Sequence, residues 1–353
     1  MSTQLRLAPS HECEIVNCLD DWAALCSLWD EFVLVHPKGS IFHTSQMIRV
    51  LAAAKGHSPV ALAALEPNGQ ITAILVAARV QTLPGPMGRM SSRSIMFAEP
   101  LCGDSPSSVD ALARLIARHD QKMSRRVLFT EVRPLFAPGS EHEALIRCGY
   151  SYLEYLNQIV DVSQPLDELW LDVHKTARRK IRQCERRGWQ VREVDAATAG
   201  EHFYSLLKLS YGRARVPLAD RSLFDAAIHE LQPRGMIRLF ATYEENTPLA
   251  MDAVLLFKGR AYLWYGGLRR DMGVSPCAIL RWHELRWAHE NGFTIYDTGG
   301  AGWPHIPYGV RDFKSQFGGQ LVQYGRYRRV YSPWKMALAE RAYELGRKVL
   351  FRK

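Results

Sequence analysis

The sequence predicts a mixed α/β (α+β) protein of two tandem domains, each a twisted mixed sheet flanked by helices, with a helical insertion between them. Three observations lead to this fold class. The chain has 353 residues, which is more than one hydrophobic core ordinarily holds. Each half closes with the same order of strand, loop, helix and strand. A basic helical segment at residues 165–187 belongs to neither pattern. We therefore expect one domain over residues 1–162 and a second over residues 163–353.

In the first half, hydrophobic periodicity predicts helices and strands in alternation. Helices are expected over residues 18–34, 42–54, 107–123 and 143–148. Strands are expected over residues 60–65, 70–82, 94–97, 127–132 and 152–162. The turn residues at 66–69 (EPNG) join two of these strands into a hairpin. Gly149 ends the last helix as a C-cap glycine.

In the second half, the same patterns predict a sheet with three clear helices. Strands are expected over residues 236–243, 248–257, 260–266, 293–296 and 321–331. Helices are expected over residues 276–290, 309–317 and 332–353. The first of these helices has strong boundary signals, because Ser275 can cap it, Pro276 suits its first position and Gly292 follows its end.

Composition indicates a soluble globular protein, with 47% hydrophobic and 23% charged residues. No apolar run approaches the roughly 20 residues that span a bilayer, and the first residues lack the apolar core of a signal peptide. The seven cysteines are scattered and form no Cys-x-x-Cys pair, which is typical of reduced thiols rather than of disulfides or a zinc site. We therefore expect a cytoplasmic protein that needs no metal ion and no redox cofactor.

Positive charge is concentrated in two segments of a chain whose net charge is +9. Residues 174–188 contain seven Lys or Arg and one Glu, and residues 321–353 contain nine and two. Such local fields suit a polyanionic partner: phosphates of a nucleotide, an RNA or an anionic membrane face. The alternative for each segment is a solvated helix face. The basic amphipathic helix at the end can lie peripherally at the inner face of the cell membrane, or pack on the second domain.

The stretch from Tyr296 to Tyr324 has an unusual density of polar groups between two apolar segments. It begins where a predicted buried strand ends, crosses a Gly- and Pro-rich loop and enters a short helix. Open α/β folds place their chemistry in loops at the carboxyl ends of strands. The candidate side chains of this site loop, residues 296–319, are Asp297, His305, Tyr308, Arg311 and Lys314.

Part of this stretch, GVRDFKSQFGG at residues 309–319 with DTGG at 297–300 before it, resembles the closing signature of the Fem-type aminoacyltransferases. It is equally similar to a related group of GNAT-like acyltransferases in bacterial envelope and polysaccharide pathways. The resemblance implies two GNAT-like domains and transfer of an acyl group to an amine.

Two further segments resemble the same family. The basic helical segment matches a region that meets a phosphate-bearing substrate in the family, which makes Arg178, Arg179 and Arg182 candidates to bind it. The family also places an aromatic residue and an arginine shortly before a substrate-domain helix, and here that arginine is Arg215. Its planar fork could hold a carboxylate or a phosphate, and the alternative is an arginine of a surface loop.

Acyl transfer to an amine requires a neutral amine, a stabilised oxyanion and a protonated leaving group. Lys314 can supply a cation, Asp297 can accept a proton, and Tyr308 can donate one to the leaving oxygen. Arg311 is expected to bind substrate. Each of the three also has a structural alternative: Lys314 as a surface lysine, Asp297 as a cap of the following turn, and Tyr308 as a packed ring. We expect His305 to be a plain loop residue.

The two enzyme hypotheses differ in the molecule that donates the acyl group, which is either acyl-CoA or aminoacyl-tRNA. Acyl-CoA enzymes of the GNAT type bind pyrophosphate in a glycine-containing loop before a helix. Arg270 and Gly273 fit that loop, but Ser275 departs from the pattern and Pro276 removes a backbone donor. Fem-type enzymes take the group from aminoacyl-tRNA, and the basic segments suit an RNA partner.

We therefore predict aminoacyl transfer from tRNA to an amine of a peptidoglycan precursor or a similar phosphate-bearing or lipid-linked acceptor. The first alternative is acyl-CoA-dependent N-acylation in polysaccharide or envelope biosynthesis. The second, of a different class, is a non-catalytic polyanion-binding protein.

Overall fold

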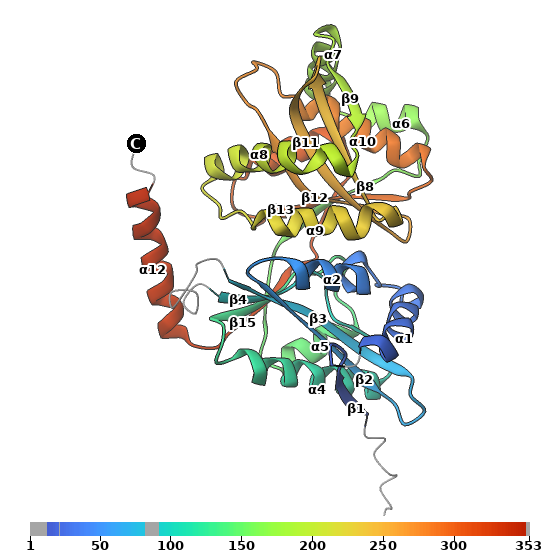
Figure 1. The fold of residues 1–353 in the computed structure, drawn as a ribbon, viewed down its shortest axis with the longest axis vertical. Helices are drawn as coiled ribbons and strands as arrows, with labels where there is room; N and C mark the ends of the chain where they lie inside the picture. Colours follow the sequence, from blue (N-terminus) through green and yellow to red (C-terminus); the bar gives the residue numbers. More distant parts are fainter. Residues whose placement is uncertain (1–12, 21, 82–91, 351–353) are drawn as a thin grey trace, which may run out of the picture.

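The computed structural model describes residues 13–20, 22–81 and 92–350, and it confirms a mixed α/β fold with two mixed sheets flanked by helices. Figure 1 shows the two halves stacked one above the other, with the first half below. Among the described residues no helix is both long enough and apolar enough to cross a membrane. The same part of the chain contains no group of three potential metal ligands.

The first sheet is antiparallel except where β4 meets β6. Its strands, in spatial order, are β1 (Glu14–Asn17), β2 (His57–Leu65), β3 (Ile71–Gln81), β4 (Ser92–Met96), β6 (Phe129–Val132), β15 (Arg326–Val330) and β7 (Ser151–Leu153), with β5 (Leu101–Cys102) paired to β3. The helices of this half are α1 (Trp22–Val35), α2 (Ser45–Ala53), α4 (Pro106–Met123) and α5 (Ser140–Arg147). Helices α4 and α5 bury their apolar face against β2 and β3, and α1 packs on the opposite face.

The second sheet has one parallel pair, β12 with β13. Its strands, in spatial order, are β14 (Gln320–Val322), β8 (Leu156–Asp161), β13 (Ile295–Gly302), β12 (Arg260–Leu268), β11 (Thr247–Phe257), β10 (Ile237–Glu244) and β9 (Gln190–Glu193). The helices are α6 (Leu166–Asp172), α7 (Lys175–Arg186), α8 (Ala196–Ala214), α9 (Arg221–Leu231), α10 (Cys277–Glu290) and α11 (Gly309–Lys314). Helices α6, α7 and α10 share a core on one face of this sheet, and α8 and α9 cover the other face.

One apolar core joins the two halves. It contains Ile41, Met47 and Leu51 around α2, together with side chains of α8, α9 and the second sheet. Arg49 of α2 also bridges to Glu230 of α9 with an Nε–Oε1 distance of 2.7 Å. The two halves therefore meet over packed side chains rather than over a solvated linker.

Two strands cross between the halves. The single strand expected over 152–162 is two strands in different sheets, since β7 belongs to the first sheet and β8 to the second. The single strand expected over 321–331 divides in the same way into β14 and β15. Both expectations were wrong because the chain leaves one sheet for the other between Leu153 and Leu156, and again between Val322 and Arg326. At the second change Gly325 has φ of 72°, in the left-handed region, and its N–H donates to the carbonyl of Tyr155 at the first change. The division at 162 and 163 stays a prediction about folding units.

Other predicted elements differ in detail. The helical segment at 165–187 is two helices, because the chain leaves α6 at Val173 and His174 caps α7 by accepting from Thr176 N–H. Ser275 does not cap α10, since Pro276 occupies the N-cap position. Helices α8 and α9 were not predicted. The C-terminal helix, α12 (Pro333–Leu350), begins as expected just after Ser332.

Candidate active site

Strands β12 and β13 are paired over only a short part of their length. Three residue pairs join them, from Arg260 with Ile295 to Tyr262 with Asp297, and among the described residues no further ladder pair follows although both strands continue. Beyond Asp297, β13 stays paired to β8 through register shifts at its glycines. Gly299 and Gly302 have φ of 81° and 82°, so the strand bulges where a loop was expected. Asp297 is therefore a strand residue, and the loop begins only after Gly302.

Lys314 places its ammonium group between the two diverging strands. Its Nζ donates to the carbonyl oxygen of Gly300 at 2.9 Å. A Cβ atom built on Gly299 would lie 3.6 Å from the carbonyl oxygen of Leu263 in β12 and 3.8 Å from Lys314 Nζ. Burial lowers the pKa of Lys314 to about 8, and the nearby guanidinium of Arg281 acts in the same direction. The side chain is thus a cation at neutral pH, with two further N–H donors beyond the one that Gly300 accepts.

Asp297 lies on the other side of Gly299. Its carboxylate is 1% exposed, and Oδ1 accepts the N–H of Gly299 at 2.7 Å. Oδ2 has no hydrogen-bond partner among the described residues. Burial raises the pKa of Asp297, against the opposite effects of the Gly299 hydrogen bond and of Arg260 and Lys314. A buried carboxylate with a raised pKa and one unpartnered oxygen can accept a proton from a ligand.

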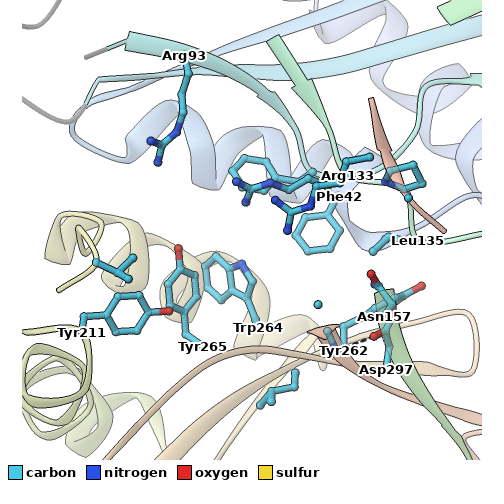
Figure 2. Close-up of a pocket in the computed structure, with 18 of the residues that line it drawn as sticks. Phe42, Arg93, Arg133, Leu135, Asn157, Tyr211, Tyr262, Trp264, Tyr265 and Asp297 are labelled. Atoms are coloured by element: carbon cyan, nitrogen blue, oxygen red, sulfur yellow. Dashed lines mark hydrogen bonds between the residues drawn. The ribbon is translucent and has the colours of Figure 1, made fainter. Parts of the chain in front are cut away.

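Asp297 opens into a cavity of about 360 Å³ between the two halves. Figure 2 shows aromatic rings on both sides of it and arginines that descend from the first half. The aromatic lining residues are Phe42, Phe97, Tyr211, Tyr262, Trp264 and Tyr265; the charged ones are Arg93, Arg133, Asp297 and Arg326. Lys314 itself is outside the lining, but Gly299 and Gly300, which it contacts, belong to it. A volume of this size suits one end of a small-molecule substrate.

The other candidate residues of the predicted site loop contact the loop itself, Glu154 or solvent rather than Asp297 or Lys314. Arg311 donates to the carbonyl oxygens of Trp303 at 2.9 Å and Ile306 at 2.8 Å, so it holds the loop before α11. Tyr308 is 38% exposed and packs on Gly302, where a Cβ atom would lie 2.9 Å from its ring. His305 is exposed, with Nε2 3.5 Å from an oxygen of Glu154.

The arginines of α7 lie at the outer end of the second half, away from the cavity (Figure 1). Arg179 and Arg182 are exposed, as the cationic stripe predicts, whereas Arg178 is half-buried with its guanidinium carbon 6.0 Å from the centre of the Trp170 ring. Arg215 is exposed with φ of 55°, and the next two residues, Val216 and Pro217, line the cavity.

The loop of Arg270 and Gly273 leads from β12 to α10, as expected. Arg187, at the end of α7, donates to the carbonyl oxygen of Met272 and lies 3.6 Å from where a Gly273 Cβ would be. The thiol of Cys184 in α7 is 3.7 Å from the carbonyl oxygen of Ser275. Helix α7 therefore packs directly against the loop that would hold a pyrophosphate.

Sequence reasoning missed a buried charge cluster on the far side of β13. Arg281 of α10 donates to Asp252 at 3.0 Å and to Glu284 and Tyr296 at 2.6 Å each, and all four side chains are buried. The signals were present, since Asp252 interrupts an apolar strand, and Arg281 and Glu284 stand three residues apart on the buried face of α10. This cluster contributes to the electrostatic environment of Lys314.

Comparison with known families identifies a domain in the second half of the chain. Residues 172–315, which include the diverging strands, Asp297 and Lys314, match the model of the acetyltransferase (GNAT) domain. Residues 172–315 therefore form a GNAT-like acyltransferase domain. The expected resemblance to Fem-type and GNAT-like acyltransferases is thereby confirmed. No protein among curated sequences matches this acyltransferase.

Solved structures show the same fold along most of the acyltransferase. FemX has a TM-score of 0.65 at 15% identity, with 91% of this chain and 98% of FemX covered. A tandem GNAT protein from the clavulanic acid biosynthesis pathway has a TM-score of 0.57 at 12% identity, covering 91% and 99%. L-PGS from Bacillus licheniformis has a TM-score of 0.56 at 13% identity, covering 94% and 98%. At these identities the likeness concerns the fold alone.

Proposed function

We propose that this acyltransferase moves an aminoacyl group from aminoacyl-tRNA to an amine of a phosphate-bearing cell-envelope precursor, such as a peptidoglycan precursor or a lipid-linked acceptor. One observation carries the proposal. A half-buried lysine and a buried carboxylate, one oxygen of which has no partner among the described residues, flank Gly299 and Gly300 at the edge of a cavity lined by three arginines.

The two side chains supply complementary parts of the reaction. The acceptor amine attacks the ester carbonyl and loses a proton to Asp297, while a new C–N bond forms. The Lys314 ammonium stabilises the oxyanion, for which one positioned donor is worth about 2.7–4 kcal/mol. When the C–O bond breaks, the proton held by Asp297 passes to the leaving ribose hydroxyl. Tyr308, at the start of α11, stays a candidate for the last step of this transfer: its hydroxyl would donate a proton to the leaving oxygen and take up the proton held by Asp297.

Two features favour an RNA donor over acyl-CoA. The ammonium of Lys314 stands in the gap between β12 and β13, and α7 packs on the loop of Gly273, where a pyrophosphate would bind. The exposed stripe that contains Arg179 and Arg182 suits a phosphate backbone, whose binding weakens as salt rises. The acyl-CoA alternative requires that loop to be open to a ligand.

A direct assay separates the donors. The purified acyltransferase would be mixed with a UDP-linked muropeptide and either charged tRNA or acetyl-CoA, and the product identified by mass. We expect an added aminoacyl group with charged tRNA and no transfer from acetyl-CoA. Acetylation that persists at moderate salt would overturn the proposal and place the donor at Arg270 and Gly273.

The pH profile of kcat/KM should be bell-shaped with a falling limb near pH 8. Activity rises with pH as Asp297 ionises, because only the carboxylate can accept a proton, and its raised pKa moves this limb above the usual range for Asp. Activity then falls as Lys314 loses its proton with a pKa of about 8. The Lys314→Met variant should lose the falling limb. A limb at about pH 10, the ordinary value for lysine, would contradict this assignment.

Helix α12 supports a peripheral contact with an anionic membrane surface, where lipid-linked acceptors are held. Figure 1 shows α12 at the side of the two halves. Trp334 and Leu338 are 68% and 49% exposed at positions i and i+4, next to the exposed Lys335 and Arg341. Apolar and basic groups together on one exposed surface are typical of helices that lie in the membrane interface.

We expect the double variant Lys335→Glu, Arg341→Glu to bind vesicles that contain phosphatidylglycerol at least about tenfold more weakly than the wild type, since each basic residue near such a surface is worth about 1 kcal/mol. Co-sedimentation with vesicles measures this. The control is Arg125→Glu, Arg126→Glu, which changes the same charge on an exposed turn of the first half. Equal loss in both variants would indicate a general charge effect and contradict the contact through α12.

A further inference from the structure

Three arginines in or next to the first sheet share one buried carboxylate. Glu131 of β6 is 3% exposed and contacts Arg133 Nε at 2.9 Å, Arg326 Nη1 at 3.0 Å and Arg328 Nη2 at 2.7 Å. Burial alone would raise the pKa of Glu131, but Arg133 and Arg326 lower it to about 2. Glu131 therefore supplies one full negative charge at any physiological pH. Three guanidinium groups around one carboxylate leave two positive charges uncompensated within the cluster.

Two of the three arginines turn this excess charge toward the cavity. Arg133 and Arg326 belong to its lining, whereas Arg328 does not. The Arg326 guanidinium carbon lies 3.6 Å from the centre of the Tyr155 ring, and that of Arg133 lies 5.9 Å from the centre of the Phe97 ring. Stacking on the rings and pairing with Glu131 fix both guanidinium groups before any ligand arrives.

The rest of the lining limits which ligand can satisfy this charge. Trp264 and Tyr265 stand on the opposite wall with ring centres 5.0 Å apart, and Tyr211 lies 5.8 Å from Tyr265 (Figure 2). A ligand that extends between the two walls meets guanidinium groups on one side and aromatic surface on the other. The carboxylate of Asp297 lines the same cavity and is suited to an amine.

We propose that Arg133 and Arg326 form an anion subsite that binds the phosphate or diphosphate group of the acceptor, with its attached ring against Trp264 and Tyr265. The assignment of the ligand as the acceptor rests on the proposed function. Two uncompensated guanidinium groups match a group that carries two negative charges, and their planar forks match phosphate oxygens. The acceptor class is then an amine that also carries phosphate. The diphosphate could belong to a nucleotide or to a lipid carrier.

Binding of inorganic pyrophosphate tests the subsite without any transfer reaction. Calorimetric titration at constant ionic strength would compare the wild type with Arg326→Gln, Arg133→Gln and Arg328→Gln. We expect the first two variants to bind at least about tenfold more weakly, because each loses a hydrogen bond between charged groups. Arg328→Gln is the matched control, since it removes the same charge from the same carboxylate but is not among the residues that line the cavity. It should bind nearly as well as the wild type.

If all three variants bound pyrophosphate equally weakly, only the overall positive charge of the cluster would attract the anion. That result would overturn the subsite. Unmeasurable binding by the wild type would overturn it as well. Thermal unfolding midpoints of the variants confirm that each is folded before it is titrated. Because no donor or turnover is involved, absence of aminoacyl transfer would refute the proposed function and leave this result standing.

Two further ligands distinguish the sources of the diphosphate. UDP should bind more tightly than pyrophosphate if a base or sugar ring reaches the aromatic wall, and Trp264→Ala should weaken UDP alone. If UDP and pyrophosphate bind equally, the ring does not contact this wall, and that part of the proposal is wrong. A water-soluble short-chain prenyl diphosphate that binds more tightly than UDP would assign the subsite to a lipid carrier.

Discussion

Lys314→Met should lower the turnover number of acyl transfer by about 10²–10³-fold while KM changes little, as expected for loss of one oxyanion donor. Methionine fills a similar volume, and replacement of the half-buried Lys314 cation by an apolar side chain removes its cost of desolvation. The fold should therefore survive. Steady-state kinetics with charged tRNA, together with the thermal unfolding midpoint, measure both effects.

The control is Lys180→Met on α7, which removes the same charge from a half-buried lysine. Lys180 Nζ lies 3.5 Å from Gln316 Oε1, close to α11 but outside the gap between the strands. Its turnover should stay within a factor of about two of the wild type, as expected for a peripheral ion without a role in the transition state. Full activity of Lys314→Met would remove the lysine from the mechanism.

The sequence was most informative where polar residues stand in a short stretch with a recognisable signature. Asp297 and Lys314 are 17 positions apart, and the motif predicted that both would belong to one site. The structure brings them to either side of Gly299 because β13 bulges at its glycines and α11 turns back toward the gap. The bulges were missed because a run of glycines with no hydrophobic period is typical of a loop.

The strand exchange could not be predicted from alternation of apolar and polar residues. That pattern indicates which face of a strand is buried, but it carries no information about which sheet the strand joins. Residues 152–162 and 321–331 each read as one continuous strand. Only pairing in three dimensions shows that β8 lies beside β13 and that β15 lies between β6 and β7.

In the sequence, Arg326 and Arg328 could be recognised only by their contribution to the net charge of residues 321–353. Arg326 and Arg328 contributed to the basic C-terminal segment, for which a polyanionic partner (nucleotide phosphates, an RNA or an anionic membrane face) or a solvated helix face was expected. Their spacing of two residues places both on one face of β15, beside Glu131 of the neighbouring strand. A charge count cannot reveal such a cross-strand cluster, since Glu131 is 195 positions away from Arg326.

Arg281→Met should destabilise the second half by about 3–5 kcal/mol, the usual cost of breaking a buried ion pair by removal of one partner. Arg281 is the guanidinium that contacts both Asp252 and Glu284, and these two carboxyl groups are 3% and 0% exposed. Burial already raises the pKa of both carboxyl groups, and the positive charge of Arg281 opposes that rise. Without Arg281, each must take up a proton or stay charged in an apolar core.

Urea unfolding, followed by the fluorescence of the tryptophans, would measure the loss. Arg286→Met is the matched control, because Arg286 is on the same helix and its contact with Glu290 at 3.6 Å is exposed on both sides. It should cost about 1 kcal/mol or less. The loss in Arg281→Met should also shrink as the pH falls, since protonation of Asp252 and Glu284 removes the uncompensated charge. Equal effects of the two variants, or a loss that does not depend on pH, would show that the Arg281 cluster stabilises the core by packing rather than by charge.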